Sequence, residues 1–132
     1  MITEEFDKVI ERRIELINSV MRSKNKEYAS DKDKFHNFKS STGISFHSSQ
    51  EKVAWEFMTK HLQSIKDMLD KVEKGGHSSV PSVEYLEEKI GDAINYLILI
   101  EGMLKERKVW DQQKKKYNKK KDFLPLQVIK KI

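Results

Sequence analysis

The stretch LEEKIGDAINYLILI, residues 86–100, decides the fold of this chain. Apolar residues recur in it at the three- and four-residue spacing of an α-helix, and from Ala93 to Ile100 they surround the helix almost completely. A helix that is apolar on nearly every side is a buried helix. Asn95 interrupts this apolar run, and Asp92 lies about one helical turn before Asn95. We therefore expect a central helix that buries these two polar side chains or places them in a cleft.

The sequence on both sides predicts an all-α protein with three main helices. Apolar residues at helical spacing mark each helix, and the chain holds only five Gly and two Pro, which favours long helices over a many-turned β protein. The predicted helices cover about 3–23, 49–74 and 82–108, with a long ordered loop over 24–47.

Capping residues support these boundaries. Ser48 with Glu51 has the spacing of a capping box, and Ser82 is the expected N-cap of the third helix. Gly75 and Gly76 end the second helix. The third helix either ends near Lys108 or continues through the lysines that follow it.

The composition limits the class of protein. A chain of 132 residues without cysteine predicts one domain, and it excludes a disulfide scaffold, a thiolate zinc site and a cysteine nucleophile. The longest apolar run is far shorter than the roughly 20 residues of a membrane span, and the N-terminus is acidic where a signal peptide is basic. We expect a cytoplasmic protein without a membrane partner.

Charge is distributed unevenly along the chain. From Lys105 to Ile132 there are eleven Lys or Arg against three acids, a net charge of +8, so residues 1–104 carry −3 of the total of +5. We expect a main domain over 1–108 and a basic extension over 109–132 that docks by its apolar end. The lysines of Lys114–Lys121 favour contact with nucleic acid, or form a solvated helix end.

Polar residues interrupt the apolar faces of all three helices. Arg13 lies on the apolar face of the first helix and His61 on that of the second. The third helix carries one polar stripe, made of Glu84, Glu88, Asp92 and Asn95. These groups form either an internal polar network or a shared cleft in which the acids hold a divalent cation. Carboxylates four residues apart project to one side of a helix, and ligands of this kind suit Mg²⁺.

Several short motifs resemble a known family. They are Lys24-Asn25-x-Glu27-Tyr28, Phe35-x-Asn37-Phe38, Lys60-His61 and Glu88-x-x-x-Asp92-x-x-Asn95-Tyr96. In this order they resemble the MazG-like proteins of phages and bacteria, and more narrowly the phage "nucleotide modification associated" all-α domain. The family's second acidic motif has the spacing Glu-x-x-Asp, whereas this chain has Glu-x-x-x-Asp.

The resemblance implies a Mg²⁺-dependent nucleoside triphosphate pyrophosphohydrolase, which forms a dimer or tetramer in the cytoplasm of a bacterium or a phage-infected host. It implies Glu88 and Asp92 as metal ligands, while Glu84 or Glu27 would activate the attacking water. It implies that substrate is bound by Lys24, Asn25, Tyr28, Phe35, Asn37, Phe38, Lys60, His61 and Asn95.

Two other functions stay open from the sequence. The chain is either a non-catalytic accessory protein that binds nucleic acid or a host protein through its basic tail, or a helical oligomer whose buried polar groups fix the register. Three helices make an incomplete bundle, so a second copy is expected to cover the remaining apolar surface.

Overall fold

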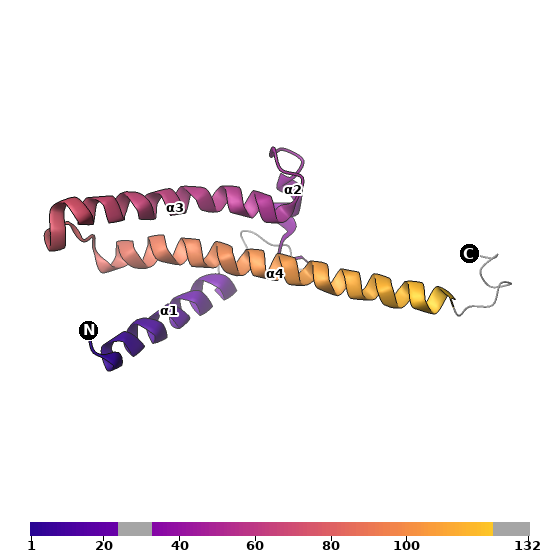
Figure 1. Ribbon diagram of the computed structural model, residues 1–132, viewed down its shortest axis with the longest axis horizontal. Helices are drawn as coiled ribbons and strands as arrows, with labels where there is room; N and C mark the ends of the chain where they lie inside the picture. Colours follow the sequence, from indigo (N-terminus) through magenta and orange to yellow (C-terminus); the bar gives the residue numbers. More distant parts are fainter. Residues whose placement is uncertain (24–32, 123–132) are drawn as a thin grey trace.

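The computed structural model describes residues 1–23 and 33–122, and these ranges form helices and connections without a β-strand (Figure 1). The elements are α1 (Thr3–Ser23), α2 (His36–Ser41), α3 (Gln50–Gly75), the 3₁₀ turn η2 (Gly76–Ser79) and α4 (Val83–Asp122). α3 and α4 form an antiparallel hairpin, α1 packs on another side of α4, and α2 lies at the start of α3. The predicted all-α fold is confirmed.

The caps of the hairpin follow from local chemistry. The Ser49 hydroxyl accepts the backbone N–H of Lys52 at 3.4 Å, so the N-cap of α3 is one residue later than the predicted Ser48. At the other end Gly76 has φ +68°, a conformation that favours glycine, and its N–H bonds the Val72 carbonyl. The predicted Ser82 cap is present, because its hydroxyl accepts the Tyr85 N–H at 3.2 Å.

The core lies where α2 meets the open end of the hairpin. It is made of Phe35, Phe38, Val53, Ala54, Leu99 and Met103. The Phe35 ring lies against Gly102 of α4, and a Cβ there would come within 2.9 Å of the ring. The long connection predicted over 24–47 therefore supplies two core phenylalanines, Phe35 and Phe38, whereas its residues 24–32 lie outside the described part.

The sequence left two possible lengths open for the third main helix, and α4 has the longer one. It passes Lys108 without a break and continues to Asp122, so the boundary expected after residue 108 lies inside a helix. No Gly or Pro occurs between Met103 and Asp122 to end it. Arg107 donates to the Glu51 carboxylate, with its Nη2 at 2.9 Å, and this interaction lowers the pKa of Glu51. The apolar residues after Asp122 lie outside the described part.

α1 is only partly covered by the other described helices. Its second half packs towards α4, whereas four apolar side chains of its first part are about half exposed: Phe6, Val9, Ile10 and Ile14. None of the helices within 1–23 and 33–122 is long and apolar enough to cross a membrane.

The burial pattern of α4 gives a matched pair of core variants. Met103 is completely buried, whereas its neighbour Leu104 is half exposed. We expect Met103→Ala to lower the free energy of unfolding by about 2–5 kcal/mol, because it leaves a cavity in the core. Leu104→Ala should change it by about 0.5 kcal/mol or less. Urea denaturation measures both, and equal losses would contradict this core.

Candidate functional site

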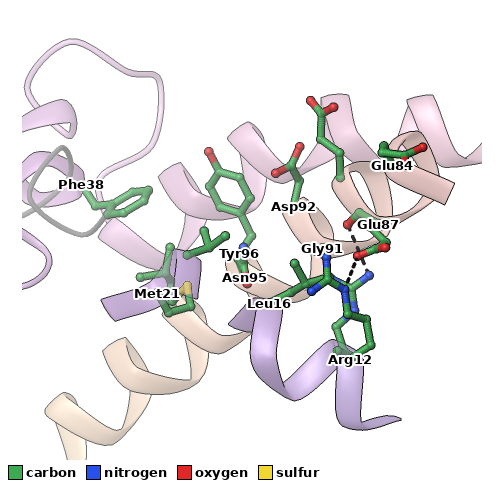
Figure 2. Close-up of a pocket in the computed structure, with 14 residues that line it drawn as sticks. Arg12, Leu16, Met21, Phe38, Glu84, Glu87, Gly91, Asp92, Asn95 and Tyr96 are labelled. Atoms are coloured by element: carbon green, nitrogen blue, oxygen red, sulfur yellow. Dashed lines mark hydrogen bonds and ion pairs between the residues drawn. The ribbon is translucent and has the colours of Figure 1, made fainter. Parts of the chain in front are cut away.

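A pocket of about 500 Å³ lies between α1 and α4, with Phe38 of α2 at one end (Figure 2). Its lining from α1 is Arg12, Arg13, Leu16, Val20 and Met21. Its lining from α4 is Glu84, Glu87, Glu88, Gly91, Asp92, Asn95, Tyr96 and Leu99. The pocket thus runs along the polar stripe of α4, and its two ends differ in chemistry.

Charged side chains gather at the end of the pocket near the start of α4. The Arg12 Nε donates to the Glu87 carboxylate at 3.0 Å (Figure 2). Arg12 also pairs with Glu15 of its own helix at 3.3 Å. These hydrogen bonds raise the pKa of Arg12, and the bond to Glu15 has the largest effect. Glu84 and Glu88 extend the acidic lining on the same helix. The charge of Arg12 is therefore already balanced by neighbouring carboxylates.

Arg13 differs from Arg12 because its charge has no acidic partner among the described residues. Its Nη2 donates to the backbone carbonyl of Glu87 at 3.3 Å. A Cβ at Gly91 would lie 2.7 Å from Arg13 Nη1, so the guanidinium occupies space that only glycine leaves free. A positive group is thereby held against the backbone of α4, beside the acidic stripe.

The other end of the pocket is apolar, with one amide. Its apolar lining is Leu16, Val20, Met21, Phe38 and Leu99. Asn95 also lines the pocket, and its Oδ1 is buried without a hydrogen-bond donor among the described residues. A buried acceptor without a partner costs about 1–3 kcal/mol, so a ligand that donates to Asn95 would recover this energy.

His61 supports the site from the α3 side. Its Nδ1 lies 3.3 Å from Asp92 Oδ2, and its ring stacks on Tyr96 with the ring centroids 5.3 Å apart. His61 does not line the pocket itself. It orients two α4 side chains that do, which makes it a positioning residue.

The structure brings together only part of the predicted site. Glu84, Glu88, Asp92, Asn95 and Phe38 all line the pocket. Phe35 instead lies in the core against Gly102, and Lys60 and Asn37 are exposed residues outside the lining. The remaining predicted residues lie outside the described part: Lys24, Asn25, Glu27 and Tyr28.

Two charged lining residues were not predicted, Arg12 and Glu87. Their pairing joins α1 to α4 across 75 positions of sequence. The apolar period of each helix says nothing about which exposed charges meet across helices. In the sequence, the adjacent pair Arg12-Arg13 was the one local indication that this part of α1 has charged contacts as well as apolar ones.

The predicted metal site has a limited set of donors. Among the described residues, no three His, Asp or Glu side chains are close enough together to hold one metal ion. Glu88 and Asp92 are one helical turn apart and line the same pocket. Mg²⁺ is usually bound by one or two carboxylates and completes its shell with water and phosphate oxygens, so these two donors fit it.

Comparisons with known protein families, with curated proteins and with solved structures find no match for this chain. The resemblance to MazG-like proteins therefore stays a prediction from the motifs.

Asn95 provides a test of whether the pocket is built for a ligand. Replacing it by leucine removes the buried acceptor that has no partner, so we expect Asn95→Leu to raise the free energy of unfolding by about 1 kcal/mol. Asn118→Leu, on the exposed part of the same helix, is the control and should change it by less than about 0.5 kcal/mol. Urea denaturation without ligand measures both. A marked loss of stability in Asn95→Leu would indicate a purely structural amide.

Proposed function

We propose that this pocket binds a nucleoside triphosphate with Mg²⁺ and that the protein hydrolyses it to the monophosphate and pyrophosphate. The observation that carries the proposal is the two-ended lining between α1 and α4. One end has carboxylates and the acid-free guanidinium of Arg13, and the other has apolar side chains and the Asn95 amide. A nucleoside triphosphate is divided in the same way, with charged phosphates at one end and a flat base at the other.

The volume and the apolar end support a ligand of this size. A pocket of about 500 Å³ lies within the range of about 300–1,000 Å³ typical of small-molecule sites. Phe38, Val20 and Leu99 offer an apolar surface to a base, and Asn95 Oδ1 offers an acceptor for its amino or imino hydrogen.

The charge of the lining supports the need for a divalent cation. Four carboxylates and two guanidiniums give the lining a net charge of −2, which repels a polyphosphate. Glu88 and Asp92 are the residues that would hold Mg²⁺. When bound, the ion supplies positive charge that neutralises the phosphate oxygens.

The chain's own groups have defined parts in the proposed reaction. Water adds to the α-phosphorus, the bond from that phosphorus to the bridging oxygen breaks, and pyrophosphate leaves with that oxygen. The Glu84 carboxylate takes the proton of the attacking water. The alternative base predicted from the sequence, Glu27, lies outside the described residues. Arg13 faces the phosphates and stabilises the charge that grows on them.

Ligand binding is tested by thermal denaturation with common NTPs and dNTPs, in Mg²⁺ and in EDTA. A nucleotide at a concentration of about 100 times its Kd should raise the free energy of unfolding by about 2.7 kcal/mol. This stabilisation should be seen in Mg²⁺ and not in EDTA. Arg13→Ala should lose this gain, whereas Arg22→Ala, an exposed α1 variant outside the pocket, should keep it. Asp92→Ala should lose the gain as well.

A pyrophosphate-release assay then separates binding from hydrolysis. Stabilisation without release would leave a nucleotide-binding protein and reject the enzyme. If no nucleotide stabilises the folded wild type in either condition, the pocket does not serve this ligand and the proposal fails.

We also propose that α1 packs against a second copy of the chain. Phe6, Val9, Ile10 and Ile14 are each about half exposed on one helix, which is costly in water. An identical helix offers a surface of the same chemistry, as in the isologous contact of a two-fold dimer. This contact would complete the bundle that one chain leaves open.

The dimer contact is tested by light scattering after gel filtration. The wild type should have at least twice the mass of the chain, and Ile10→Glu should reduce it to the monomer. Lys8→Glu introduces the same side chain, with an even larger change in net charge, at an exposed neighbouring position that lies off the apolar face, and it should stay oligomeric. A monomeric wild type, or equal dissociation of both variants, would reject this contact.

A further inference from the structure

The distal part of α4 extends past the other described helices as a single exposed helix (Figure 1). Arg107 pairs with Glu51, the second residue of α3, so the hairpin ends there. Every residue from 107 to 121 is exposed. This segment is outside the pocket, and the proposed nucleotide chemistry makes no use of it.

Two large aromatic side chains stand on this exposed helix. Trp110 is 67% exposed and Tyr117 is 60% exposed. They are seven residues apart, so they lie on one face about 10.5 Å from each other along the helix axis. Lys114 and Lys121 lie on the same side, at spacings of four, three and four residues. The face therefore alternates aromatic rings with positive charges.

The charge of the segment is strongly positive. Residues 108–121 hold seven lysines and one aspartate, a net charge of +6. Lys115 pairs with Asp111 at 3.1 Å, and none of the other six lysines forms an ion pair with a described residue. A partner with regularly spaced negative charge would complement this surface.

The pattern distinguishes a polynucleotide from a membrane surface. A helix that lies on a membrane needs a broad apolar face opposite its charged face. Between residues 108 and 121 the only apolar or aromatic side chains are Val109, Trp110 and Tyr117, and the lysines point to all sides of the helix. Lysines that follow a phosphate backbone, with aromatic rings for bases to stack on, are the combination found in proteins that bind single strands.

We propose that the exposed helix 108–121 binds single-stranded nucleic acid. The lysines contact the phosphates, and bases stack on Trp110 and Tyr117. Binding of this kind has little sequence preference and is strongly salt-dependent, because each phosphate contact releases counterions. The pocket and this helix then form two separate sites on one protein.

Tryptophan fluorescence reports stacking directly. The chain has two tryptophans, and Trp55→Phe leaves Trp110 as the single emitter. Oligothymidylate or oligouridylate should quench this emission in low salt. High salt should dissociate the oligonucleotide and restore the emission. In Trp110→Phe, where Trp55 of α3 is the emitter, the same oligonucleotides should leave the emission nearly unchanged. Quenching of Trp55 but not of Trp110 overturns the proposal.

Matched lysine variants test the phosphate contacts. Replacing Lys119, Lys120 and Lys121 by glutamine should weaken oligonucleotide binding at least tenfold. It should also lower the slope of log affinity against log salt by about 2, since each contact contributes about 0.7. The control replaces three exposed lysines of α3, Lys52, Lys71 and Lys74, and carries the same net charge. Equal losses in both variants overturn the assignment to this helix.

Partners of other chemistry give distinct results. Binding to phosphatidylserine vesicles without binding to either oligonucleotide would assign the helix to a membrane surface and overturn the proposal. Failure to bind any oligonucleotide at low salt would overturn it as well. Neither result affects the nucleotide proposal, which depends on the pocket and on Arg13.

Discussion

The arrangement of this protein depends on the close approach of two side chains to the backbone of α4. Gly91 and Gly102 are eleven residues apart, which is three turns, so they lie on one face of that helix. Arg13 lies against the first glycine and the ring of Phe35 against the second. One contact holds α1, and the other holds the segment that leads into α2. The first of these contacts belongs to the pocket, whose lining from α4 runs from Glu84 to Leu99 on both sides of Gly91.

The helices could be predicted from the sequence because helical periodicity and capping are local properties. The ends were less certain where two local solutions compete, as between Ser48 and Ser49. The polar stripe of the pocket was also predictable, since Glu88 and Asp92 share one helix and its period fixes their common side. Pairs such as Arg12 with Glu87 depend on how α1 is rotated against α4. The apolar periodicity of each helix does not determine that rotation.

α4 combines functions that many proteins distribute over several elements. Its first part packs on α3 with one side and lines the pocket with another, and its last part contacts neither. Asn95 in the pocket and the exposed Trp110 are fifteen residues apart, about 22 Å along one continuous helix. A helix is stiff over this length, so the two proposed sites keep a constant separation.

The exposed end of α4 also has a consequence for local stability. Beyond Arg107 the helix has no described tertiary partner, so its order rests on intrinsic propensity and on pairs such as Asp111 with Lys115. Opening of such a segment costs less free energy than opening of the packed half. Amide hydrogens along one unbroken helix would therefore exchange with solvent at graded rates, slowly beside Met103 and quickly beside Lys119. The protein carries a stability gradient along a helix of uniform geometry.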